Sequence, residues 1–184
     1  MNEDRGLVGG ASQRIREETM SIWNKHPNYG ADELRILTAV AAETLVDCAD
    51  DPGVTPDILR VPPRSAAMEI QTALNERDTS IEREAIQAAL ENPDQASRIA
   101  LFVLDQIRQV PPLADKVAEA YDARRREMFS PELLLMAGAV VILSIKVKNF
   151  KVSKDGLQTS FYEANEAVKT FVTGLVKSTP TPES

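Results

Sequence analysis

Apolar side chains recur every three or four residues along most of this chain, which is the spacing of an amphipathic α-helix. The pattern is clearest near the C-terminus, where Ala164, Val168, Phe171 and Leu175 fall on one side of a helical wheel. It predicts α-helices over residues 11–25, 32–49, 65–77, 79–91, 92–109, 113–128, 130–146 and 163–177, and a short helical turn at Thr55–Pro56. The chain is therefore expected to be mainly α-helical and to fold as a helical bundle.

Two of these helix starts carry capping residues. The side-chain amide of Asn92 can accept hydrogen bonds from free backbone N–H groups, and Pro93, which follows it, suits the first position of a helix. Gln95 lies three residues after Asn92. Thr79 and Glu82 have the spacing of a capping box, in which each side chain binds the other residue's free backbone N–H. We expect one helix to begin at each of these pairs.

The stretch from 130 to 161 differs in character from the rest of the chain. It opens with a helix start at Ser130–Glu132, and the run Leu133–Ile145 that comes next contains no charged residue. The apolar alternation then slips by one residue at Lys148–Asn149, which indicates either a helix that persists to about Lys146 or a β-bulge at the slip. We favour the helix.

Two interpretations of the apolar run stay open. Its 13 residues span about 20 Å as a helix, whereas the hydrocarbon core of a bilayer is about 30 Å thick. The simpler interpretation is a core helix in which Gly138 lets a neighbouring helix approach closely. The alternative is a helix over 131–147 that enters a membrane or contacts a partner through Leu133, Leu134, Leu135, Met136, Val140, Val141, Ile142 and Leu143.

A β-hairpin is predicted after this run. Asp155–Gly156 is a preferred pair for a two-residue type I′ turn, because both positions need a positive φ. That turn would place Phe150 opposite Phe161. One face of the hairpin would then be apolar, formed by Phe150, Val152, Leu157 and Phe161. Because a lone hairpin is marginal in water, this face has to be covered by helices or by another chain.

Composition and charge narrow the classes of function. The net charge is −7, and the acidic excess lies in residues 1–130, where 23 acidic residues accompany 15 basic ones. A phosphate backbone would be repelled by this part, so nucleic-acid binding is not expected. The single cysteine, Cys48, excludes a disulfide within the chain and a cysteine-rich metal site, and it fits a reducing, cytoplasmic compartment. The N-terminus has no apolar segment typical of a secretory signal.

Residues that could carry chemistry are few. His26 is the only histidine and lies in a turn sequence, which is more typical of a surface residue than of a catalytic one. The chain contains no nucleotide-binding glycine motif, no nucleophile elbow and no zinc-binding helix motif. Arg124, Arg125 and Arg126 could contact an anionic partner, although a solvated helix end is the simpler interpretation. No enzymatic activity, cofactor, metal or small-molecule ligand is predicted.

The sequence therefore predicts a flexible N-terminus (1–10), an acidic helical bundle (11–128), a part packed on it (129–177) and a disordered tail (178–184). The predicted function is non-enzymatic protein–protein interaction or assembly, with self-association. The predicted interaction surface comprises Phe150, Val152, Leu157, Phe161, Val168, Phe171, Val172 and Leu175. The alternative is a membrane-associated effector or anchor on the cytoplasmic side, inserted through the apolar helix.

Overall fold

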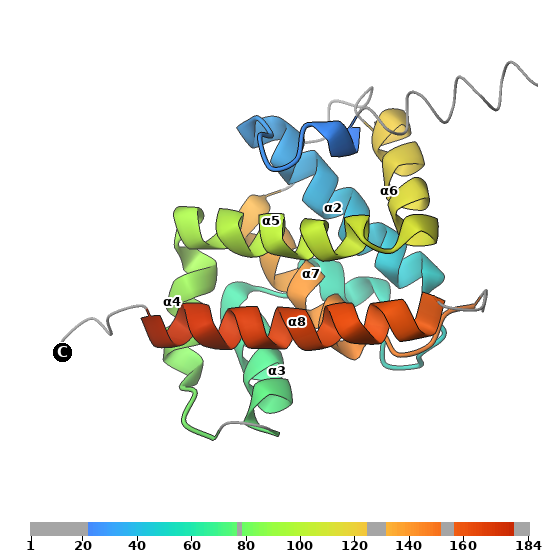
Figure 1. The fold of residues 1–184 in the computed structure, drawn as a ribbon. Helices are drawn as coiled ribbons and strands as arrows, with labels where there is room; N and C mark the ends of the chain where they lie inside the picture. The colour runs from blue at the N-terminus through green and yellow to red at the C-terminus, as the bar shows by residue number, and fades with distance from the viewer. Residues whose placement is uncertain (1–21, 77–78, 125–131, 152–156, 179–184) are drawn as a thin grey trace, which may run out of the picture.

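The computed structural model describes residues 22–76, 79–124, 132–151 and 157–178, and these parts of the chain are mainly helical (Figure 1). In chain order, the elements are α2 (Ala31–Cys48), the 3₁₀-helix η1 (Pro56–Arg60), α3 (Pro63–Asn75), α4 (Arg83–Glu91), α5 (Pro93–Arg108), α6 (Pro111–Arg124), α7 (Leu133–Lys146) and α8 (Leu157–Ser178). The prediction of a mainly α-helical bundle is confirmed.

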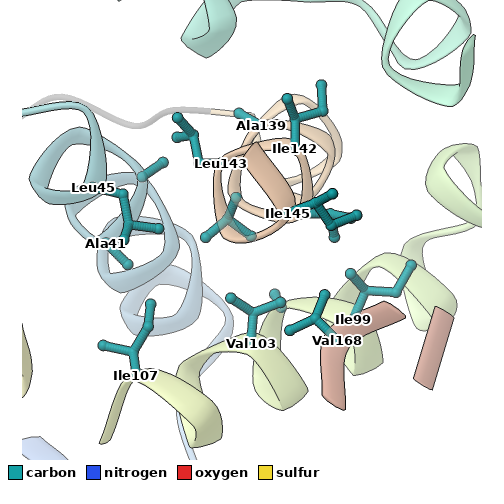
Figure 2. Packing of buried hydrophobic residues seen from close by; sticks show 14 of the residues in the cluster. Ala41, Leu45, Ile99, Val103, Ile107, Ala139, Ile142, Leu143, Ile145 and Val168 are labelled. Carbon is teal, nitrogen blue, oxygen red and sulfur yellow. The ribbon is translucent and has the colours of Figure 1, made fainter. Parts of the chain in front are cut away.

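Helix α7 lies at the centre of the bundle. It packs against α2, α3, α4, α5, α8 and η1. Figure 2 shows Leu45 of α2, Val103 of α5 and Val168 of α8 arranged around helix α7. Leu143 is fully buried, and the residues from Ala137 to Val141 are buried as well. A helix apolar all round needs such a central position, because it has no face that gains from contact with water.

Gly138 lies at a close approach between α7 and α3. A Cβ added at Gly138 would lie 3.1 Å from Cβ of Ala66 on α3 and 3.8 Å from Cδ1 of Leu90 on α4. The predicted close approach of a neighbouring helix at Gly138 is therefore confirmed. Most of the buried apolar residues that the structure describes belong to one cluster that extends from Ile22 to Val176, so the parts predicted for 11–128 and 129–177 share a hydrophobic core.

The predicted β-hairpin is wrong. Residues 157–161, expected to form its second strand, are the first turns of α8. Among the described residues, extended pairing is limited to one antiparallel bridge between Ala49 and Phe150. The turn residues Asp155–Gly156 lie outside the described residues. A helix is favoured over a strand here because Phe161 has helical spacing to Ala164 and Val168, so that all three are buried along one face of α8.

The segment after α7 is held by the end of α2 instead of by a second strand. The carboxylate of Asp51 accepts hydrogen bonds from the backbone N–H groups of Lys148 (2.8 Å) and Asn149 (3.0 Å), and from the Asn149 side chain (3.0 Å). The Lys151 N–H donates to the Cys48 carbonyl at 2.9 Å. In a strand, consecutive N–H groups point to opposite sides, whereas here two consecutive N–H groups point to one carboxylate. This local backbone conformation accounts for the one-residue slip in the apolar alternation at Lys148–Asn149.

Other boundaries agree with the sequence to different degrees. The Asn92 side chain accepts from the N–H groups of Asp94 and Gln95 with Pro93 at the first position, so the predicted start of α5 is confirmed. The predicted capping box at Thr79 is wrong, because Glu82 occupies the N-cap position and α4 begins only at Arg83. Helix α7 ends at Lys146, as favoured from the sequence.

Candidate interaction surface

Helix α5 presents two different faces. Ile99, Val103 and Ile107 point into the core and are at most 1% exposed. The outward side carries Arg98 and, one turn further and at the flank of the buried face, Phe102, which is only partly buried. The helix is anchored at its start by the Asn92 cap, which satisfies backbone donors that would otherwise lack partners. The inner face thus fixes the rotation of α5, and the rotation places Phe102 at the surface.

Phe102 forms a stacked aromatic pair with Phe171 of α8. The two ring centroids lie 4.1 Å apart, and the ring planes are inclined by only 4°. Helices α5 and α8 run side by side across one face of the molecule (Figure 1), and both phenylalanines are partly buried against the core. The pair lines an open, shallow hollow of about 310 Å³, together with His26, Arg98, Leu101 and Asp105. We call this hollow and its six lining residues the aromatic surface.

The polar edge of the aromatic surface is organised around Asp105. Its carboxylate accepts hydrogen bonds from Arg108 Nη2 (2.9 Å) and Gln109 Nε2 (3.1 Å), and His26 Nε2 lies 3.5 Å from Oδ1. Arg98, by contrast, is exposed and forms no ion pair with the described residues. Arg98 is therefore the cation at this edge that remains open to an external carboxylate.

His26 is held in a partly apolar setting beside this edge. Its ring contacts Tyr29 edge-to-face at a centroid distance of 5.6 Å, and its side chain is 9% exposed. Burial and the positive charge of Arg108 lower the pKa of His26, although Asp105 partly opposes them. Burial likewise raises the pKa of Tyr29 to about 12. Both side chains are therefore uncharged at neutral pH, so neither adds charge to the aromatic surface.

The aromatic surface does not have the composition of a catalytic site. A histidine next to an aspartate is two thirds of a nucleophilic triad, but the described residues that line the hollow include no serine, threonine or cysteine. Nor do the described residues contain a cluster of three or more His, Cys, Asp or Glu side chains suited to a metal ion. What the arrangement can do is bury an apolar group against two rings and pair a carboxylate with a guanidinium.

The predicted interaction residues lie mostly inside the fold. Phe150 (5% exposed) and Phe161 (2%) contact each other edge-to-face with centroids 5.1 Å apart. Phe171 is partly buried and is the one described side chain of the set that reaches the surface. Val168, Val172 and Leu175 are buried, whereas Val152 and the side chain of Leu157 lie outside the described residues. The bundle itself thus covers the face for which the sequence predicts a second chain.

The residues of the predicted membrane or partner helix are likewise internal. Leu133 and Leu135 are partly buried, and the side chain of Leu134 lies outside the described residues. The remaining members are buried: Met136, Val140, Val141, Ile142 and Leu143. Among the described helices, none combines the length and the apolar character needed to cross a bilayer.

The basic run predicted to contact an anion can be placed only in part. Arg124 Nη2 forms an ion pair with the carboxylate of Glu43 on α2, and its side chain is 27% exposed. Arg125 and Arg126 lie outside the described residues. Arg124 is thus engaged within the fold.

The sequence interpretation overlooked Phe102, because the middle of α5 is apolar almost all round and is typical of a core helix. The available signal is that Phe102 has Arg98 one turn before it and Asp105 one turn after it, so it lies in a row of polar residues. No protein-family model, no curated protein and no solved structure matches this chain. Any functional conclusion therefore rests on the geometry of the fold and of its surface.

Proposed function

We propose that this protein acts by binding a partner protein through the aromatic surface and that it is not an enzyme. The observation that carries this proposal is the stacked Phe102–Phe171 pair, which is partly exposed and lies next to the exposed cation Arg98. Aromatic residues and arginine are the side chains most enriched in the centres of protein interfaces, where they contribute most of the binding energy.

The edge chemistry defines the partner. A segment that fills the hollow needs a large apolar or aromatic side chain to pack on the two rings, and a carboxylate nearby to pair with Arg98. Because His26 and Tyr29 are uncharged at neutral pH and Asp105 is already paired with Arg108, Arg98 sets the charge preference. We therefore propose a partner segment that combines an apolar side chain with an Asp or Glu.

Two other exposed apolar side chains are weaker candidates. Met68 (52% exposed) and Tyr162 (66%) are the large hydrophobic residues most open to water among those described. They belong to different helices, α3 and α8, and scattered single apolar residues are ordinary on protein surfaces. The aromatic surface differs because several partly exposed apolar groups adjoin there.

The alternative functions receive less support. Insertion of α7 into a membrane would remove the central helix from contact with α2, α3, α5 and α8, and so would dismantle the core. Self-association through the C-terminal residues would need Phe161, Val168 and Val172, which the single chain already buries. We propose a cytoplasmic location, which the single cysteine supports.

A phage-displayed dodecapeptide library, selected on the full-length protein, tests this proposal. We expect enrichment of peptides in which Phe, Tyr, Trp or Leu lies within a few residues of Asp or Glu. Synthetic copies of the enriched peptides should bind the wild type and lose affinity on Arg98→Glu, by roughly fivefold or more, because one ion pair becomes a repulsion. Phe171→Ala should also weaken binding, since it removes one ring of the pair.

The matched control is Arg64→Glu, which makes the same charge change at an exposed arginine of α3 outside the hollow. It should bind the enriched peptides as the wild type does. Equal losses in the two charge variants would mean only a general charge effect, and no peptide enrichment above an unrelated acidic protein would remove the proposal. Light scattering at micromolar concentration should show a monomer; a dimer that dissociates on Arg98→Glu would instead assign the aromatic surface to a second copy of the chain.

A further inference from the structure

A second, separate cavity lies where three segments meet. It has a volume of about 170 Å³ and is bounded by the end of α2, the start of α6 and the segment after α7. Pro112, Leu113 and Phe150 supply its apolar walls. Cys48 also lines it, and its thiol is the only one in the chain.

The walls of this cavity are held in place by other parts of the core. Leu113 is 2% exposed and Phe150 is 5% exposed, and Phe150 packs edge-to-face on Phe161. The Lys151 N–H donates to the Cys48 carbonyl at 2.9 Å, which ties the segment after α7 to the end of α2. Because its walls pack against the core, the cavity is preformed, and a ligand would not have to order them on binding.

Charged side chains line the same cavity. Lys116 and Lys151 are exposed and form no ion pair with the described residues, and Asp47 is the accompanying acid. All three act on the Cys48 thiol: the two lysines tend to lower its pKa and Asp47 tends to raise it, while burial, the largest influence, keeps it above the ordinary value. The residues that line the cavity therefore carry a net charge of +1, from two lysines and one aspartate, on a chain whose net charge is −7. Lys151 also lines a neighbouring hollow with Asp50 and Asp51, so Lys116 is the lysine that faces fewer acids.

We propose that this cavity binds a small amphipathic carboxylate, whose apolar part enters between Leu113 and Phe150 and whose negative charge pairs with Lys116 and Lys151. A dry cavity of roughly 150 Å³ accommodates benzene, so this one has room for a single ring or a chain of about six carbons. One carboxylate suits the site because Asp47 offsets part of the lysine charge. The proposal does not depend on the aromatic surface, which shares no lining residue with this cavity.

Cys48 makes occupancy measurable. Burial raises the pKa of the thiol, so it is a poor nucleophile and has no catalytic part in this proposal. As the only cysteine, it reports on the cavity through its alkylation rate by N-ethylmaleimide, a neutral reagent. We expect hexanoate to slow this alkylation saturably, with half-protection at roughly millimolar concentration for a ligand of this size.

Matched ligands separate the apolar contribution from the charge. 1-Hexanol has the same chain without the charge and should protect roughly two- to fivefold less well than hexanoate, as expected for a partly exposed ion pair. Hexylamine carries the opposite charge and should not protect at the same concentration. In ¹⁵N spectra, hexanoate should shift the amide signals of Leu113 and Lys151.

Matched variants test the two lysines. Lys116→Gln and Lys151→Gln should each move the protection by hexanoate toward that by hexanol. Lys148→Gln makes the same charge change three residues from Lys151, outside the cavity lining, and should leave protection unchanged. Equal protection by the three ligands would overturn the carboxylate assignment. The site itself would be overturned if hexanoate left the alkylation rate unchanged at concentrations tens of times above the expected half-protection value.

Discussion

The contact between Gly138 and Ala66 offers a size-swap experiment at the centre of the fold. The single change Gly138→Ala adds a methyl group whose carbon would lie 3.1 Å from Cβ of Ala66, closer than ordinary contacts between such carbons. Alanine is favoured over glycine in a helix by about 1 kcal/mol, whereas forcing an extra methyl group into a packed core costs about 1–3 kcal/mol. We expect a net loss of about 1 kcal/mol in the free energy of unfolding.

The reciprocal change, Ala66→Gly, should also destabilise the protein. It removes one fully buried methyl group, worth about 0.8 kcal/mol, and costs up to about 1 kcal/mol of helix propensity in α3. In the double variant, the gain in helix propensity at position 138 largely cancels the loss at position 66. One methyl group still fills the contact, but α7 supplies it instead of α3. The double variant should therefore be within about 1 kcal/mol of the wild type, although the two single losses add to about 3 kcal/mol.

Urea unfolding, followed by circular dichroism on the four proteins, measures this coupling. Equal urea dependences of the unfolding free energy would show that the variants alter stability and not the unfolded state. The reasoning predicts a favourable coupling of about 2 kcal/mol between the two sites. Losses that add to within about 0.5 kcal/mol would show that α3 and α7 do not meet at these two residues.

Two further predictions concern polar residues that fasten the end of α7. Asp51→Ala removes the acceptor of the Lys148 and Asn149 amides and should cost about 1–2 kcal/mol at pH 7. Burial alone would raise the pKa of Asp51, but the hydrogen bonds from Lys148 and Asn149 outweigh burial and bring this pKa below its ordinary value. The stability that these hydrogen bonds give is therefore complete above about pH 4, and it is lost as the pH falls through the folded-state pKa. Urea titrations at a series of pH values should show the difference between variant and wild type shrinking below pH 4, and a constant difference would contradict this account. Asn165→Ala removes the donor to the carbonyls of Ser144 (2.8 Å) and Ile145 (2.6 Å) and should lower the free energy of unfolding by about 1–3 kcal/mol. The exposed control Thr170→Ala should lower it by less than about 0.5 kcal/mol. Equal losses in the two variants would exclude a capping role for Asn165.

The sequence by itself determined the helical elements. The 3.6-residue periodicity identified α2, α5 and the greater part of α8, and local signals such as Asn92–Pro93 marked a helix start to within a residue. The length and uniform apolarity of the run 133–145 favoured a core helix ending near Lys146, which is where α7 ends. These features depend on neighbours in the sequence, so they can be inferred from it.

Tertiary structure decided the conformation of the chain on either side of the predicted hairpin turn. The turn pair Asp155–Gly156 favoured a hairpin, but Asp51, about a hundred residues earlier, binds the backbone of Lys148 and Asn149, and burial of Phe161 in the core extends α8 to begin at Leu157. A local turn preference is worth little against several long-range hydrogen bonds and a buried aromatic ring.

Tertiary structure also decided which apolar residues reach the surface. Periodicity groups Phe161, Val168 and Phe171 on the C-terminal helix without showing that the first two are buried while Phe171 stacks on Phe102 of α5. The aromatic surface exists only because two helices distant in sequence lie side by side. Exposure is a property of the packed chain, because an apolar residue is covered or left open by neighbours that its own sequence context does not specify.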